Sequence, residues 1–184
     1  MVTEDECPRP DTNLEQLAQL RPVFADGGTV TAGNACPVDD GAAAVAVVSG
    51  RRFREPGPRR GLRVVDSVTR GVDPEVPGRG PVPAVRAPLS RKPDVSLGDV
   101  GVVEFTEAFA GQVPACLDEL VIPEAEVNRG GGAIALGHPW GASGAVLLTR
   151  LFADVPGDPV PAPGTARPRS ARRAGWASPR RSNR

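Results

Sequence analysis

Apolar positions in the N-terminal part of the chain predict one short helix and one buried strand. Leucine and alanine recur at helical spacing after Thr12, and Glu15 completes a capping-box pattern, so we expect a helix that ends before Pro22. Residues 27–41 predict a brief strand followed by a loop of small side chains. Residues 42–49, AAAVAVVS, are typical of a strand covered on both faces, although periodicity alone leaves a buried helix open.

In the rest of the pattern, strands alternate with helices. Residues 50–61 are rich in proline, glycine and arginine and predict an exposed connection between two structural halves. Beyond them we expect a strand at 62–72, a helix at 80–92, a buried strand at 100–105, a helix at about 107–120, a turn or strand at 130–136 and a helix at 143–152. Pro114 is expected to kink its helix at a cost of about 3 kcal/mol. The alternation implies an α/β fold with a mostly parallel, layered sheet.

The apolar pattern stops after about Asp154. Residues 155–184 are dominated by proline, arginine, alanine, glycine and serine and are predicted to form a disordered tail. Seven arginines and one acid lie in residues 156–184, so the preceding part carries 15 basic and 21 acidic side chains although the whole chain has no net charge. The tail lacks a folded platform, and no specific nucleic-acid partner is expected.

Composition limits the class of protein. At 184 residues and 40% apolar content the chain can bury a core, and its 4% aromatic content without tyrosine favours packed α/β layers. The three cysteines lack metal-ligand spacing and cannot form a zinc set with one histidine, so no metal is expected. No apolar run approaches the roughly 18 residues that span a bilayer, and the acidic N-terminus is unlike a signal peptide. We expect a soluble, cytoplasmic protein.

The single histidine, His138, lies in the confined stretch GGGAIALGHPWGASGA of residues 130–145. It comes just before a predicted helix start at Ser143, its small neighbours let a substrate approach the ring, and Pro139 restricts its backbone. Such a histidine can act as a base or donate to a developing oxyanion. A loop histidine bonded to a carbonyl is an equal alternative on the local pattern alone.

A second candidate site follows the buried strand at 100–105. Thr106 and Glu107 lie at the strand edge where open α/β sheets bind ligands, although Thr106 could equally cap the next helix. Other motifs are excluded by spacing. The glycines around His138 fit neither nucleotide-phosphate motif, and GASGA is not the G-x-S-x-G of a hydrolase nucleophile elbow.

Ordered motifs over about residues 4–152 carry a family resemblance. They include TVTAGNACPVDDGAAA, EFTEAFAGQ and VNRGGGAIALGHPWGASGA. In that order these resemble the runs T-V-T-A-G-N-A-S-G-x-N-D-G-A-A-A, E-x-N-E-A-F-A-x-Q and N-x-N-G-G-A-I-A-L-G-H-P-L-G-A-S-G-A of the thiolase family of acyl-CoA acyltransferases.

The resemblance implies two similar α/β halves stacked as an αβαβα sandwich. It divides the chain into the end of the N-terminal domain at 1–50, a linker at 51–60, part of the C-terminal domain at 61–154 and the tail at 155–184. It also implies that His138 activates a nucleophilic cysteine and helps hold the thioester oxygen, with Thr106 at the family's asparagine position. The residues implied to line the pantetheine channel of coenzyme A (CoA) are Ala32, Ala35 and Cys36, with Ala108 and Phe109 on the opposite side.

The family reaction implied is a ping-pong acyl transfer. A cysteine takes the acyl group from a 3-ketoacyl-CoA and CoA then receives it, or the reverse condensation runs. CoA and acyl-CoA are substrates in this reaction, and no cofactor is implied. A complete family member is expected to be a homo-oligomer.

The sequence departs from the family pattern where the chemistry is carried. No cysteine of the chain lies in a catalytic-cysteine motif, neither Cys7, Cys36 nor Cys116. Threonine replaces the family asparagine at 106, Cys36-Pro37 replace Ser-Gly, and Pro77 replaces methionine. We therefore expect an inactive fragment or frameshifted product of a thiolase gene. The alternative is a non-catalytic CoA-binding or regulatory partner of a complete thiolase subunit.

Overall fold

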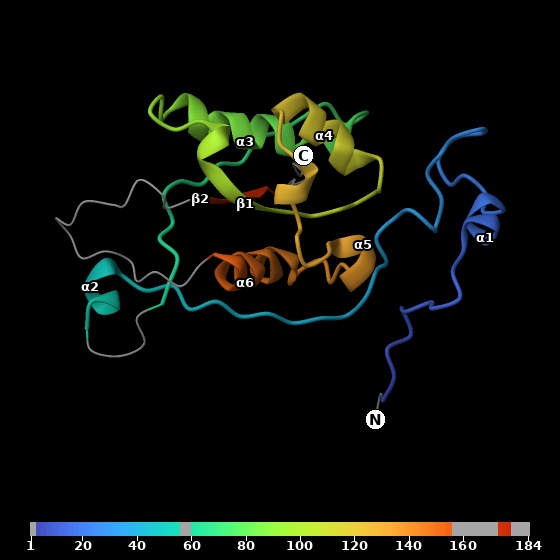
Figure 1. The fold of residues 1–184 in the computed structure, drawn as a ribbon, viewed down its shortest axis with the longest axis horizontal. Helices are drawn as coiled ribbons and strands as arrows, with labels where there is room; N and C mark the ends of the chain where they lie inside the picture. Colours follow the sequence, from blue (N-terminus) through green and yellow to red (C-terminus); the bar gives the residue numbers. More distant parts are fainter. Residues whose placement is uncertain (1–2, 56–59, 156–172, 178–184) are drawn as a thin grey trace.

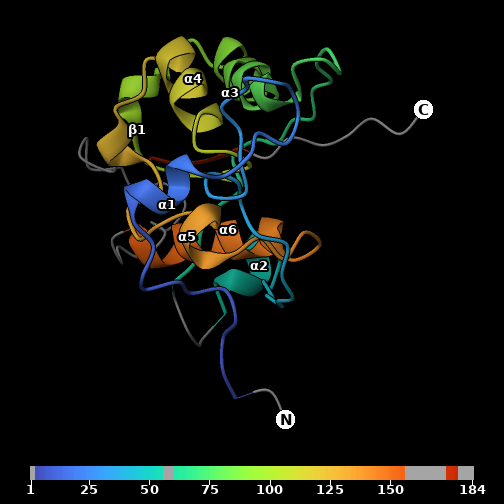
Figure 2. The same cartoon turned by 90° about the vertical axis from the view of Figure 1, so that its right-hand side faces the viewer.

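The computed structural model describes residues 3–55, 60–155 and 173–177. Its centre is a strand layer between two helical layers, and the N-terminal segment with α1 (Leu14–Ala18) lies at the edge of the molecule (Figure 1). The strand β1 (Val100–Phe105) lies in the middle. The helices α3 (Pro81–Ser90) and α4 (Gln112–Leu120) lie on one side of it, and α5 (Ala133–Leu136) and α6 (Ser143–Asp154) lie on the other (Figures 1 and 2). The α/β layering expected from the sequence is confirmed.

β1 is buried on both faces, as predicted for this valine-rich segment. Because successive side chains of a strand point to opposite faces, the strand contributes to two contact regions. One face packs against α3 and α4 in a single apolar cluster, made by Val82, Val103, Phe105, Cys116, Leu117, Leu120 and Ile122. On the other face, Glu104 contacts Arg150 of α6.

Three helices form close to where the sequence predicts them. α3 starts at Pro81, and α6 starts at Ser143 and runs two residues past the predicted end. α1 (Leu14–Ala18) also forms, but its N-cap is Asn13, whose Oδ1 accepts a hydrogen bond from the Gln16 N–H at 2.9 Å. The predicted Thr12–Glu15 capping box is therefore wrong by one residue, because asparagine is itself a strong N-cap.

α4 begins at Gln112, five residues later than predicted, which changes the role of Pro114. Pro114 is the third residue of the helix, where a backbone N–H would have no partner within the helix. The expected kink is therefore wrong. The residues before α4 are held instead by an antiparallel bridge between Ala35 and Phe109.

Several predicted strands are absent from the described residues. Residues 27–41 make only the isolated bridge at Ala35, and residues 42–49 and 62–72 have no regular secondary structure. Val47 is 85% exposed and Val64 is 74% exposed, so neither run is covered. A strand needs a neighbour to pair its backbone groups, and neither run has one in the described part of the chain. Helices form where a loop or strand was expected, at α2 (Gly50–Phe53) and at α5.

β2 (Arg173–Ala177) pairs in parallel with β1, with one irregularity between Val100 and Val102. The sequence predicts disorder across this tail, so the strand is a departure from that prediction. An uncovered strand edge offers unpaired N–H and C=O groups to any short segment that can extend along it. The rest of the tail, residues 156–172 and 178–184, lies outside the described residues.

Short 3-10 helices join the remaining elements, at Pro77–Arg79, Leu97–Asp99 and Glu124–Glu126. Among the helices that the structure describes, none has both the length and the apolar character that a bilayer crossing requires.

Candidate functional site

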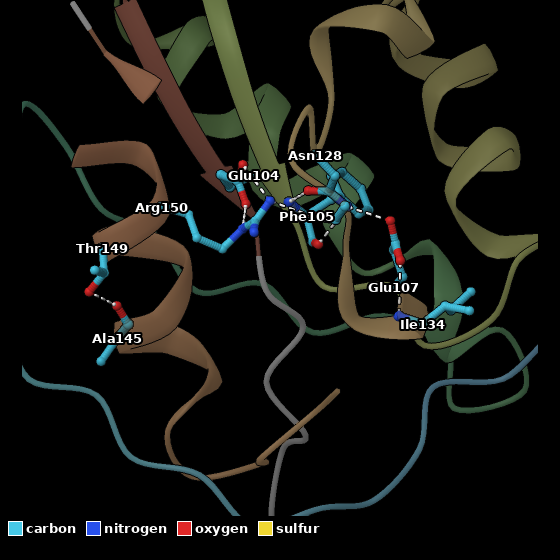
Figure 3. Close-up of polar contacts among 9 residues, drawn as sticks. Glu104, Phe105, Glu107, Asn128, Ile134, Ala145, Thr149 and Arg150 are labelled. Atoms are coloured by element: carbon cyan, nitrogen blue, oxygen red, sulfur yellow. Dashed lines mark hydrogen bonds and ion pairs between the residues drawn. The ribbon is translucent and has the colours of Figure 1, made fainter. Parts of the chain in front are cut away.

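Asn128 ties the glycine-rich loop to the end of β1. Its backbone is in the left-handed region at φ 45°, which asparagine tolerates better than most residues. Its Oδ1 accepts a hydrogen bond from the Phe105 N–H at 2.8 Å, and its Nδ2 donates to the Phe105 carbonyl at 3.1 Å and to Glu107 Oε1 at 2.7 Å (Figure 3). The loop that precedes His138 is thereby fixed to the strand.

Glu107 extends this connection to α5. Its Oε2 accepts a hydrogen bond from the Ile134 N–H at 3.0 Å (Figure 3). The carboxylate also fills the space where a side chain at Gly132 would lie, so position 132 accepts only glycine without rearrangement. The predicted ligand-edge residue Glu107 is therefore a structural tether between the strand end and the glycine-rich loop.

A buried ion pair anchors α6 to the same strand. Arg150 Nε lies 2.6 Å from Glu104 Oε2, and Glu104 is fully buried (Figure 3). Arg150 also donates to the Gly131 carbonyl, which connects α6 with the glycine-rich loop. Burial raises the pKa of Glu104, and the hydrogen bond and charge of Arg150 oppose that rise.

His138 lies at the corner between α5 and α6. Gly137 ends α5 at φ 98°, a conformation that side chains disfavour, and this turns the chain into the histidine. The His138 Nδ1 lies 2.8 Å from Ser143 Oγ, which itself donates to the Pro139 carbonyl at 3.3 Å. Both contacts of Ser143 are satisfied together when its proton points to that carbonyl, so we assign the Nδ1–H as the donor to Ser143. Nε2 is then the basic nitrogen.

The residues predicted to line a CoA channel come together in part. The Cys36 N–H donates to the Ala108 carbonyl at 3.1 Å, and Ala35 bridges Phe109. The edge of the Phe24 ring meets the Phe109 ring with centroids 5.6 Å apart. Ala32 is exposed on the loop that leads to this bridge.

Segment 36–41 brings this bridge next to the histidine corner. Asp39 Oδ2 lies against Gly137, and a side chain at Gly41 would lie 2.8 Å from the ring of Pro139. Burial raises the pKa of the Cys36 thiol, its backbone hydrogen bond opposes the rise, and Asp39 and Glu107 add to it. Burial lowers the pKa of His138, and the charge of Asp39 opposes that lowering.

Thr106 is 8% exposed and directly follows β1. Within the described residues it makes no hydrogen bond to His138, so its predicted role at the family's asparagine position stays a prediction. Sequence reasoning missed two neighbours of His138, namely Ser143 as its hydrogen-bond partner and Asp39 as a nearby charge. The position of Ser143, five residues after His138, could have indicated this pair from the sequence. The contact of Asp39 with position 137 depends on the tertiary fold.

Comparison with protein families identifies the class. The thiolase N-terminal domain matches residues 1–51, and the thiolase C-terminal domain matches residues 60–158. The second match alone covers more than half of the chain. The chain therefore belongs to the thiolase family, as its motifs predict.

Individual relatives agree with this assignment. The chain is 49% identical over 154 residues to a beta-ketoadipyl-CoA thiolase of Pseudomonas aeruginosa, a match that covers 82% of this chain and 38% of that protein. Its fold resembles the Bacillus anthracis acetyl-CoA acetyltransferase with a TM-score of 0.76 at 40% identity, over 83% of this chain and 38% of that one. Human mitochondrial 3-ketoacyl-CoA thiolase in complex with CoA gives a TM-score of 0.68 at 39% identity, over 84% and 39%. The chain thus spans less than two fifths of the length of these relatives.

Proposed function

We propose that this chain carries the histidine side of a thiolase-type acyl-transfer site that acts on CoA thioesters. The observation that supports this most directly is the His138 corner. Ser143 Oγ is the hydrogen-bond partner of Nδ1, and this leaves Nε2 as the nitrogen that can exchange a proton. Burial lowers the pKa of His138, which keeps the imidazole neutral and able to act as a base near neutral pH.

In the proposed thiolysis, Nε2 of His138 takes the proton of a cysteine thiol, and the thiolate attacks the keto carbon of 3-ketoacyl-CoA. The bond between the keto carbon, C3, and C2 of the thioester breaks. The two-carbon fragment takes up a proton at C2 and leaves as acetyl-CoA. The acyl group stays on the cysteine as a thioester. The CoA thiol then gives up its proton and removes the acyl group, and the condensation is the same sequence in reverse.

The chain's own cysteines do not fit the nucleophile of this reaction. Cys7 is exposed, and Cys116 is buried in the core, where its Sγ donates to the Gly78 carbonyl at 3.3 Å. Burial and the charges of Asp39 and Glu107 raise the pKa of Cys36, which opposes formation of a thiolate. We therefore expect the chain by itself to bind CoA without cleaving acetoacetyl-CoA.

The bridge between segments 34–36 and 108–110 supports a CoA-binding role for Cys36, Ala108 and their neighbours. Calorimetric titration of CoA into the full chain tests this role. Ala108→Trp fills the proposed channel and should weaken CoA binding at least about tenfold. Ala110→Trp is the matched control, because Ala110 is exposed two residues further along. Equal CoA affinity in the two variants, or no CoA binding by the wild-type chain, refutes the proposed channel.

A thiolysis assay tests the expected inactivity separately. Acetoacetyl-CoA cleavage by the purified chain would contradict it, and loss of that activity in Cys36→Ser would identify Cys36 as the nucleophile. His138→Ala should leave CoA affinity within about threefold, since the imidazole is proposed to move protons rather than anchor the ligand.

The second candidate function is a non-catalytic, CoA-binding partner of a complete thiolase subunit. The exposed apolar runs at 42–49 and 62–72 favour it, because such runs are suited to pairing with another chain. Co-elution of the chain with a complete thiolase relative in size-exclusion chromatography would support this candidate. Elution of the two proteins at their separate volumes over the tested concentrations would count against it.

A further inference from the structure

Two contacts place segment 36–41 on both sides of His138 along the chain. Asp39 Oδ2 lies against Gly137, the residue before the histidine, and Gly41 lies against Pro139, the residue after it. Gly137 combines a positive φ of 98° with a carboxylate in the space that its side chain would occupy. The Asp39 carboxylate can therefore occupy this position only because residue 137, immediately before His138, is a glycine.

The Asp39 carboxylate has an unmet requirement in this seat. Its Oδ1 is buried and has no hydrogen-bond partner in the described structure. A buried carboxylate oxygen without a partner is unfavourable unless a positive charge or a donor compensates it. Its charge acts on the Cys36 thiol and on the His138 imidazole, and of these two groups only the imidazole can become positive.

We propose that Asp39 is a positioning residue for His138: its carboxylate, seated against Gly137, stabilises the protonated imidazole and keeps the neighbouring Cys36 as a neutral thiol. The proposal rests on the role of His138 as the acid/base of the site. The negative charge of Asp39 favours the protonated form of both groups, because it favours uptake of a proton by His138 and opposes loss of the thiol proton from Cys36.

The other groups around the corner do not supply this charge. Ser143 is neutral and occupies Nδ1. Glu107 interacts with Cys36, but its two oxygens accept from Asn128 and Ile134. Asp40 is exposed beside Asp39. Substitution of Asp39 should therefore change the proton affinity of His138 more than substitution of these neighbours does.

Because His138 is the single histidine of the chain, nuclear magnetic resonance titration follows its imidazole without signals from other histidines. Asp39→Asn keeps the shape of the side chain and removes the charge, and it should lower the proton affinity of His138 by about tenfold. Asp40→Asn removes an equal charge from the exposed neighbour and should change that affinity less than about twofold. Equal effects of the two variants, or no effect of Asp39→Asn, overturn the proposal.

Alkylation of Cys36 provides a second measurement, resolved from Cys7 by peptide mass spectrometry. Its rate near neutral pH should rise several-fold in Asp39→Asn, because the thiolate becomes easier to form. Asp39→Ser is a second neutral variant. If both neutral variants at position 39 unfold while Asp40→Asn folds, Asp39 is a structural residue and the proposal is wrong. The titration needs neither CoA nor turnover, so a failure of CoA binding is distinguishable from a failure of this proposal.

Discussion

Residues 42–49 and β1 are similar valine-rich runs with opposite outcomes in the structure. Val103 in β1 is 4% exposed, whereas Val47 is 85% exposed. β1 has helices on both faces and β2 along one edge, and residues 42–49 pass on the side of α6 away from β1 (Figure 1). The comparison indicates that an apolar run sets only the capacity to form a strand, and that neighbouring elements decide whether it forms.

The N-terminal region, which contains residues 42–49, and the layered region around β1 meet at the candidate site. Segment 34–36 pairs with 108–110, and segment 39–41 lies against 137–139. The N-terminal region thus contributes little to the core but carries Cys36 and Asp39 to the histidine corner. Changes within the layered region should therefore affect stability most, whereas changes at the meeting point should affect proton affinity.

The largest expected difference is between two arginines. Arg150→Ala leaves the fully buried Glu104 without its partner and should lower the free energy of unfolding by about 3 kcal/mol. Arg52→Ala breaks an exposed pair between Arg52 of α2 and Glu55, two residues after the helix ends, and should cost less than about 1 kcal/mol. Urea denaturation of the two variants measures both values, and similar losses would contradict the contrast between the regions.

The same substitution in the two valine runs gives the next largest difference. Val103→Ala removes two methyl groups from the core cluster and should cost about 2 kcal/mol. Val47→Ala removes them from an exposed side chain and should change stability by less than about 0.5 kcal/mol. A loss at Val47 as large as that at Val103 would mean that residues 42–49 are covered in solution, for example by another copy of the chain.

These two runs also show how far the sequence could predict the structure. β1, α3 and α6 were predictable because apolar residues dominate each segment and the two helices have clear starts at Pro81 and Ser143. Residues 42–49 and 62–72 were predicted as strands because their composition cannot report whether a pairing partner is present. β2 was missed for the complementary reason, since Arg173–Ala177 has no strand pattern and pairs along the edge of β1.

The part of the site that lies within one short segment was predictable from the sequence. His138 and its helix start lie within six residues, and their geometry follows from the local sequence. The family resemblance implied only that Cys36 and Ala108 face each other across a channel, and the hydrogen bond between their backbones is a finding of the structure. The position of Asp39 depends on a contact between residues almost a hundred positions apart, for which no local pattern exists.

Two glycines provide a smaller contrast. A methyl group at Gly132 would collide with the Glu107 carboxylate that holds α5, so Gly132→Ala should cost about 1 to 2 kcal/mol. Gly71 lies in open space within residues 62–72, and Gly71→Ala should be neutral or slightly stabilising. Thermal denaturation compares the variants. An unchanged melting temperature for Gly132→Ala would show that Glu107 does not tether the loop as described.

The smallest expected effect is a pH dependence that arises where the regions meet. Burial lowers the pKa of His138 from its ordinary value of 6.5, so the unfolded chain binds more protons than the folded chain as the pH falls through that value. The stability contributed by the neutral imidazole is therefore present above this range and is lost on acidification. His138→Gln should remove this component, and Asp39→Asn should enlarge it, because the charge that opposes the lowering is gone. Unfolding free energies measured between about pH 5 and pH 8 test the sign. Parallel curves for the wild-type chain and His138→Gln would mean that the imidazole titrates alike in the folded and unfolded chain.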